Sequence, residues 1–214
     1  MQQSSLFKEV DTFSYERKLA LEGHACIAGL DEAGRGPLAG PVVAASVILP
    51  PDCDYTQFKD SKKLTPHKRT KLYNVLRQID ARIGTGIVSE GEIESYNILQ
   101  ASLLAMKRAV EALPVTPDFL LVDGKFQVPL SISQEALVKG ESRSASIAAA
   151  SIIAKVTRDA LMEEYHQKYP EYNFRQHKGY GTAEHRRLIR QYGPCRIHRR
   201  TFKGVREYLG GLGE

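Results

Sequence analysis

Residues 24–49 read HACIAGLDEAGRGPLAGPVVAASVIL, and this stretch decides the fold. Two apolar segments, 25–30 and 41–49, predict buried strands, and a glycine-rich turn separates them. Strands that lack a polar face are typical of a sheet that is covered on both sides. The stretch therefore predicts an α/β fold, in which two carboxylates, Asp31 and Glu32, follow the first strand directly.

The rest of the chain alternates between strand and helix patterns, which favours the same fold class. Apolar runs predict further strands over 82–89 and 119–122. Helical spacing and capping residues predict helices over 7–22, 66–79, 97–113, 142–169, 182–191 and 202–209. We expect an α/β domain over 1–170, with an N-terminal segment over 1–22, and a basic helical extension over 171–214.

The composition is that of an ordinary globular protein. Hydrophobic residues make up 42% of the 214 residues and charged residues 26%, which excludes a disordered or collagen-like chain. No apolar run approaches the ~20 residues of a membrane span, and no secretory signal is visible. The three cysteines are far apart and form no CxxC pair, so we expect the reducing cytoplasm. We also expect a monomer.

The charge is distributed unevenly. The net charge is +5, yet residues 175–206 hold ten Lys or Arg and one acid, while the rest has 20 basic and 24 acidic residues. Such an asymmetry indicates an anionic polymer as partner, although a solvated basic face would look the same. A second small basic cluster comprises Lys59, Lys62, Lys63, Lys68, Arg69 and Lys71.

Carboxylates recur at positions that can converge. Asp31 and Glu32 follow one apolar strand and Asp123 follows another, so they can meet at one sheet edge. Asp159 shares the inward helical face of Ile152 and Ala148 at ~100° per residue. Clustered oxygen ligands without His or Cys favour Mg²⁺ or Mn²⁺, and two such ions suit phosphodiester hydrolysis.

Simpler roles exist for each of these acids. An aspartate after a strand often forms a turn or caps a helix. Asp159 can form a salt bridge with Lys155 or Arg158, although these side chains are expected to point elsewhere on the helix. Three such positions in one basic protein favour the metal site.

The turn at Gly34, Arg35 and Gly36 is not a nucleotide-binding loop, because it lacks the GxGxxG pattern and no GK[ST] follows. A bare glycine backbone lets a ligand approach closely, and Arg35 can fork onto a phosphate.

Five motifs in order resemble the bacterial ribonuclease HII family. They are GLDEAGRGPLAGPVVAA from residue 29, DSKKL from residue 60, VDG from residue 122, SASIAAASIIAKVTRD from residue 144 and HKGYGT from residue 177. The resemblance covers about residues 24–192. The family pattern often has Gly-Tyr-Pro where this chain has Gly-Tyr-Gly, which should change loop stiffness more than chemistry.

The resemblance implies an RNase H-like fold with a mixed five-stranded sheet. It implies cleavage of RNA in RNA–DNA hybrids and nicking 5′ of single ribonucleotides in duplex DNA, leaving 3′-hydroxyl and 5′-phosphate ends. The implied catalytic and metal-binding acids are Asp31, Glu32, Asp123 and Asp159. The implied readers of the ribose 2′-hydroxyl are Gly34, Arg35, Gly36 and Tyr180. Lys62 and Lys63 are expected to contact phosphates, or else to be exposed loop charges.

A short N-terminal segment, QSSLF from residue 3, resembles peptides that dock on the bacterial sliding clamp. Leu6 and Phe7 would fill an apolar pocket and Gln3 would hydrogen-bond at its rim. The alternative is a staple between the first helix and the body.

Two other functions compete with ribonucleotide cleavage. A DNA-resolving nuclease could use the same acids, and the glycine turn with Tyr180 argues against it. A catalytically inactive nucleic-acid-binding protein would explain the basic tail but not the inward face of Asp159.

Overall fold

The computed structural model describes residues 11–58, 61 and 64–210. Its centre is one mixed sheet of five strands in the order β3-β2-β1-β4-β5. β1 runs antiparallel to β2 and parallel to β4, β2 is antiparallel to β3, and β4 is parallel to β5. The strands are β1 (Ile27–Ala33), β2 (Val42–Ile48), β3 (Arg82–Val88), β4 (Phe119–Asp123) and β5 (Ser133–Leu137). The predicted α/β fold with a mixed five-stranded sheet is confirmed.

The register brings the predicted acids to one end of the sheet. Leu30 of β1 pairs with Val122 of β4 in the parallel ladder, so Asp31 and Asp123 come next on adjacent strands. β1 is longer than expected, because Asp31 and Glu32 still pair with β2 and lie within the strand. Pairing with β2 holds both carboxylates on rigid backbone.

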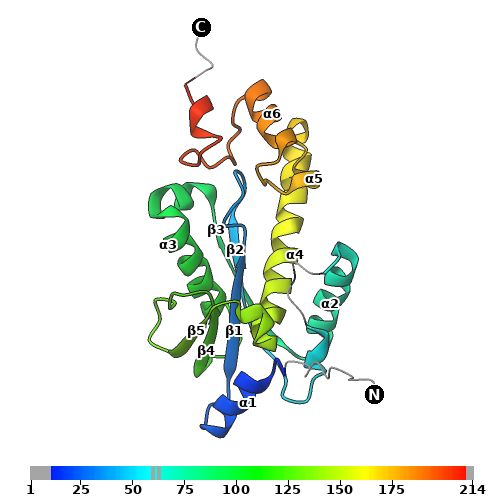
Figure 1. The fold of residues 1–214 in the computed structure, drawn as a ribbon, viewed down its shortest axis with the longest axis vertical. Coiled ribbons are helices and arrows are strands. Elements are labelled where there is room, and N and C mark those ends of the chain that lie inside the picture. The colour runs from blue at the N-terminus through cyan, green and yellow to red at the C-terminus, as the bar shows by residue number, and fades with distance from the viewer. Residues whose placement is uncertain (1–10, 59–60, 62–63, 211–214) are drawn as a thin grey trace, which may run out of the picture.

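Long helices cover both faces of the sheet (Figure 1). α3 packs on β2 and β3 from one side, while α4 packs on β1 and β2 from the other, with α2 outside α4. The helices before the extension are α1 (Ser14–Leu21), α2 (Pro66–Gln78), α3 (Glu90–Glu111) and α4 (Ala145–Lys168), with short 3₁₀ turns η1 (Tyr55–Gln57) and η3 (Gly140–Ser142).

Each face of the sheet has its own apolar core. Leu30, Val42 and Leu120 pack against α3, whereas Val47 packs with Ile152 of α4 on the other face. All five side chains are fully buried, and each contributes on the order of 1.5–3 kcal/mol through burial. The two cores explain why the central strands carry no polar face.

α3 begins earlier than its apolar pattern predicts. Ser89 and Glu92 form a capping box at its start, which satisfies the first backbone amides. Asn97 has φ +66° inside the helix and produces a kink. Before the kink, residues 90–96 contain only two apolar residues, Ile93 and Tyr96, so the apolar spacing predicts only the part of the helix after it.

The C-terminal extension continues from α4 at the far end of the molecule (Figure 1). It contains η4 (Pro170–Tyr172), α5 (Phe174–His177), α6 (Ala183–Tyr192) and η5 (Arg206–Tyr208). The predicted helix over 202–209 is wrong, because Gly204 adopts φ +95° and only the single 3₁₀ turn η5 forms. No helix in the described residues is long and apolar enough to cross a membrane.

Candidate active site

The acidic end of β1 is held rigidly. Asp31 is only 4% exposed, and its Oδ1 accepts a hydrogen bond from the Glu32 amide at 2.7 Å. The Glu32 carboxylate forms an ion pair with Arg35, whose Nη1 lies 3.3 Å from Oε1. The first strand therefore presents two fixed carboxylates directly beside the glycine turn.

Asp123, at the end of β4, lies next to a second carboxylate that the sequence analysis missed. Burial, followed by the charge of Glu141, raises the pKa of Asp123 to about 7, and Glu32 adds to the effect. The Gly140 amide donates to Asp123 Oδ1 at 2.7 Å, which opposes this shift. Three carboxylates, on β1, β4 and η3, thus act on one another electrostatically.

Only a weak sequence pattern points to Glu141 as a site residue, namely its position shortly after a strand. Glu141 follows β5, a strand of mixed polar and apolar residues that was not predicted. Because β5 runs parallel to β4, the turn after it reaches the same sheet end as Asp123. Oε2 of Glu141 is buried and has no hydrogen-bond partner among the described residues. Burying a carboxylate oxygen costs free energy unless a hydrogen-bond donor or a cation meets it.

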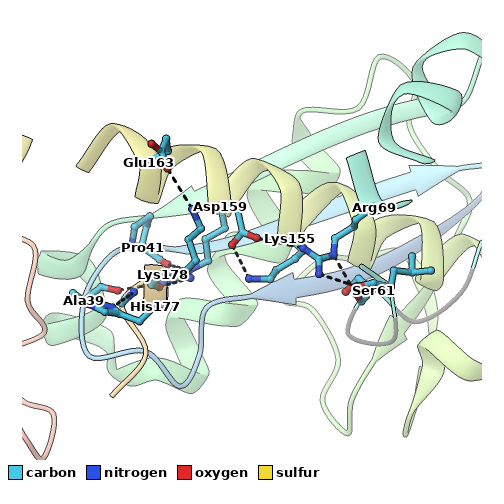
Figure 2. Close-up of polar contacts among 12 residues, drawn as sticks. Ala39, Pro41, Ser61, Arg69, Lys155, Asp159, Glu163, His177 and Lys178 are labelled. Carbon is cyan, nitrogen blue, oxygen red and sulfur yellow. Dashed lines mark hydrogen bonds and ion pairs between the residues drawn. The ribbon is translucent and has the colours of Figure 1, made fainter. Parts of the chain in front are cut away.

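Asp159 lies on α4 in a different electrostatic setting. Its Oδ1 is 2.6 Å from Lys155 Nζ and its Oδ2 is 3.4 Å from Arg69 Nη1 (Figure 2). The possible salt bridge with Lys155 is confirmed, and the expectation that Lys155 points elsewhere is wrong, because residues four apart share one face of a helix. The role of Asp159 as a metal ligand stays a prediction.

The donor chemistry at the sheet end fits a hard divalent cation. Carboxylate oxygens dominate, one has no partner in the described part of the chain, and burial together with neighbouring carboxylates raises the pKa of Asp123. In the described residues, no three His, Cys, Asp or Glu side chains are already arranged to hold a metal ion. Binding a cation would therefore require the carboxylates to draw together.

A cavity of about 220 Å³ opens beside these acids. It brings together six residues predicted for the site: Asp31, Glu32, Gly34, Arg35, Gly36 and Tyr180. Ser61, Ser151 and Lys155 complete its polar lining. The sequence motifs from β1, from α4 and from the extension thus meet at one cavity.

The glycine turn has the two properties that its role requires. Gly34 has φ +105°, and a side chain there would also collide with Arg158. A Cβ at Gly36 would meet nothing within 4 Å, so the space above this residue is open. The turn is therefore closely packed on its inner side and accessible on its outer side.

Tyr180 faces this turn from the extension. Its side chain is 43% exposed, and its ring centroid lies 5.8 Å from both Lys155 Nζ and Arg158 Cζ. Two cations against one ring stabilise its position at the cavity. With this exposure, Tyr180 is not a core residue.

A larger cavity, about 360 Å³, lies elsewhere, between α1 and the start of β1. None of the predicted site residues within the described part of the chain lines it. The described residues exclude Gln3, Leu6, Phe7, Lys62 and Lys63, so the predictions for these five lie outside the described part of the chain.

Comparisons with known proteins agree with this geometry. The family model described as Ribonuclease HII matches residues 28–205. The chain is 58% identical to Ribonuclease HII of Desulfotalea psychrophila over 202 residues, which covers 93% of this chain and 90% of the relative. It is 52% identical to Ribonuclease HII of Enterococcus faecalis, over 95% and 79% of the two chains.

Solved structures show the same fold. The ribonuclease H2 from Pyrococcus horikoshii superposes with a TM-score of 0.73 at 29% identity, covering 86% of this chain and 97% of that one. The ribonuclease HII in a complex with PCNA from Archaeoglobus fulgidus gives 0.72 at 25% identity, over 84% and 96%.

The fold and these comparisons place the chain among nucleases of the RNase H-like class. Within that class, the chain belongs to the ribonuclease HII family. It is therefore a ribonuclease H, a hydrolase that cuts RNA paired with DNA.

Proposed function

We propose that this enzyme nicks duplex DNA on the 5′ side of single embedded ribonucleotides, in addition to cutting RNA–DNA hybrids, with two divalent cations, Mg²⁺ or Mn²⁺. The observation that carries the proposal is the shared cavity of about 220 Å³, which places carboxylates, glycine turn and Tyr180 around one space. Products with 3′-hydroxyl and 5′-phosphate ends follow from attack by water, without a covalent enzyme intermediate.

Asp31, Glu32 and Asp123 are the residues that would hold the cations. When bound, the cations supply positive charge for the reacting phosphate and lower the pKa of water. The protein holds Asp31 and Glu32 on paired strand backbone and orients Asp123 through the Gly140 amide. Asp123 must lose its proton before it can serve as a ligand, because a pKa of about 7 leaves it partly protonated at neutral pH.

Two residues compete for the position of the fourth acid. Glu141 contacts Asp123 and has a buried oxygen without a partner among the described residues, which supports its inclusion. Asp159, the residue predicted from the sequence, would have to exchange Lys155 and Arg69 for a cation. We propose that Glu141 belongs to the acidic group, and Asp159 stays in the proposal as the alternative.

The glycine turn and Tyr180 would distinguish RNA from DNA. The 2′-hydroxyl is the group that differs between the two at a given nucleotide. The open face of Gly36 lets a sugar approach the backbone, while Tyr180 stands at the same cavity from the other side. Arg35, half of whose side chain is exposed, can donate to a phosphate or to the sugar.

Binding to the nucleic-acid backbone would come from the basic extension and from Lys62 and Lys63. Exposed basic residues of the extension include Arg175, Arg186, Arg187, Arg190, Arg196, Arg200, Lys203 and Arg206. Contacts of this kind add affinity without sequence preference and weaken as salt rises.

The N-terminal residues Gln3, Leu6 and Phe7 are proposed to bind a sliding clamp. The segment QSSLF supports this, and the relative from Archaeoglobus fulgidus was solved as a complex with PCNA. Replacing Leu6 and Phe7 with alanine should abolish capture of the chain by the bacterial clamp and leave nicking unchanged. Unchanged capture would contradict the proposal.

The decisive experiment uses two labelled duplexes that differ in one ribonucleotide. Each is incubated with the enzyme in Mg²⁺, in Mn²⁺ and in EDTA. We expect a metal-dependent nick immediately 5′ of the ribonucleotide and none in the all-DNA duplex. Cutting of both duplexes would contradict ribose recognition by the turn and Tyr180, and cutting of neither would contradict the nicking activity.

A further inference from the structure

A buried arginine of the C-terminal extension holds the glycine turn from behind. Arg199 has no exposed surface. Its guanidinium donates to the Gly34 carbonyl at 2.6 Å, to the Arg35 carbonyl at 2.9 Å and to the Gly40 carbonyl at 2.7 and 2.9 Å. All four hydrogen bonds end on main-chain oxygens of the loop that carries the turn.

A second buried arginine, Arg158 of α4, joins the same loop to the Tyr180 segment. Its Nε donates to the Pro41 carbonyl at 3.0 Å and its Nη2 to the Ala39 carbonyl at 3.1 Å. Its Nη1 donates to the Lys178 carbonyl at 3.0 Å, two residues before Tyr180 (Figure 2). One guanidinium therefore joins the loop after the glycine turn to the segment that carries Tyr180.

The backbone of the extension also forms hydrogen bonds with this loop. The Leu38 amide donates to Gly179 at 2.8 Å, and the Arg199 amide donates to Leu38 at 2.8 Å. The Gly40 amide donates to Ile197 at 2.9 Å. The loop after β1 thus lies between two segments of the extension, and the predicted division at residue 170 does not separate it from the site.

We propose that Arg199 is a positioning residue for ribonucleotide cleavage, which sets the conformation of the Gly34–Gly36 turn through its three carbonyl partners. The inference rests on the proposed function and assigns part of its ribose recognition to the extension. A turn with its carbonyls fixed inward presents its amides and the Arg35 side chain outward, toward the cavity. Arg199 itself touches no substrate.

The geometry requires arginine rather than any cation. A guanidinium offers five donors in one rigid plane, whereas the lysine ammonium is a single flexible point with three. Lysine at position 199 would keep the charge but could not satisfy three separated carbonyls at once. Glutamine would lose the charge and leave buried carbonyls without donors.

The test compares the wild-type enzyme with R199K, R199Q and the control R82Q. Arg82 lies at the opposite end of β3 from the site, and its exposed side chain pairs only with Asp80 among the described residues. Three quantities are measured for each: the melting temperature, the dissociation constant for an all-DNA duplex, and the single-turnover nicking rate at saturating enzyme.

We expect R199K to nick at least about tenfold more slowly and R199Q about 100-fold more slowly, since misplacement of recognition groups by ~1 Å can cost this much. The all-DNA dissociation constant of R199K should stay within about twofold of wild type, as should every value for R82Q. R199K is the variant that keeps the test valid if R199Q does not fold.

Other outcomes would overturn the inference. Wild-type nicking rates in both Arg199 variants would show that the turn needs no such support. A joint fall of melting temperature, DNA binding and nicking, or failure of both variants to fold, would give Arg199 a purely structural role. Absence of nicking by the wild-type enzyme would instead overturn the proposed function, and this inference with it.

Discussion

The glycine turn, residues 34–36, has negatively charged carboxylates on one side and positively charged guanidiniums on the other. On one side, Asp31 and Glu32 line the cavity with the turn, and at the same end of the sheet burial, followed by repulsion from Glu141 and Glu32, raises the pKa of Asp123 to about 7. Behind the turn lie the two buried guanidiniums of Arg158 and Arg199. Burial lowers the pKa of Arg199 to about 9, so it remains cationic at neutral pH.

The difference lies in how each region meets its hydrogen-bonding needs. The guanidiniums donate to main-chain carbonyls throughout and need nothing further. The acidic end keeps a carboxylate oxygen of Glu141 without a partner among the described residues. The arginines that support the turn are therefore fully hydrogen-bonded, whereas Glu141 at the sheet end is not, within the described part of the chain. A divalent cation bound together with nucleic acid would neutralise the carboxylates there.

The largest expected effect on cleavage comes from substitutions of the aspartates at the acidic end of the sheet. D31N and D123N each remove a negative charge at the sheet end, so we expect single-turnover cleavage of an RNA–DNA hybrid to fall by about 10³-fold or more. D52N, an exposed aspartate in the turn after β2, should retain wild-type cleavage. Activity of D31N or D123N within tenfold of wild type would remove these residues from the chemistry.

A second pair of substitutions tests whether Glu141 or Asp159 is the fourth acid of the site. E141Q should lower cleavage by about 10- to 100-fold, the size typical of ligands and their supporting groups. D159N should have a smaller effect, because Asp159 is already neutralised by Lys155 and Arg69. Hybrid cleavage rates of the two variants, measured side by side, decide between them. The reverse order would make Asp159 the fourth acid, as the sequence predicts.

The pH dependence of activation by Mg²⁺ tests whether the pKa of Asp123 is raised in the folded enzyme. A proton and a cation compete for Asp123, so the Mg²⁺ concentration for half-maximal cleavage should rise about tenfold per pH unit below 7. Above pH 7 it should level off. Mg²⁺ titrations of hybrid cleavage at pH 6, 7 and 8 measure this directly, and a constant half-maximal concentration would contradict the raised pKa.

The smallest effect is on stability without metal. The folded-state pKa of Asp123 lies above its ordinary value of 3.8, so stability should fall as pH rises from about 4 to 7. D123N removes this loss. Because the side chain is only half-buried, we expect a gain of about 1–2 kcal/mol, or roughly 2–8 °C, at pH 8 in EDTA. Thermal melts should show little gain at pH 4.5, and an equal gain at both pH values would point to another cause.

The acidic end of the sheet and the arginines that support the turn differ in how far the sequence predicts them. The apolar runs predicted β1 to β4, and the parallel pairing of β1 with β4 places Asp31 and Asp123 together as expected. The acidic end was therefore largely predictable, since strand ends and carboxylates are both visible in the sequence. Glu141 was missed because β5, which precedes it, begins with three polar residues and has neither an apolar run nor a strict alternation that would predict a strand.

The supporting scaffold could not be predicted in the same way. Arg199 belongs to the basic tail, where arginines suggest a solvated face, and only the folded chain shows it buried against Gly34 and Gly40. Arg158 lies one residue from Asp159 yet points inward to main-chain carbonyls. Contacts between segments over 100 residues apart depend on tertiary packing that no local pattern encodes.

The most direct test of the account is a calorimetric titration of Mn²⁺ into the full-length enzyme, compared with D123N and D52N. In two buffers of different ionisation enthalpy at pH 7, the wild-type enzyme and D52N should bind Mn²⁺ with net proton release. D123N should bind more weakly and release fewer protons. Undiminished Mn²⁺ binding by D123N, with the same proton release, would contradict the claim that the acidic end of the sheet is the part of this enzyme that a cation completes.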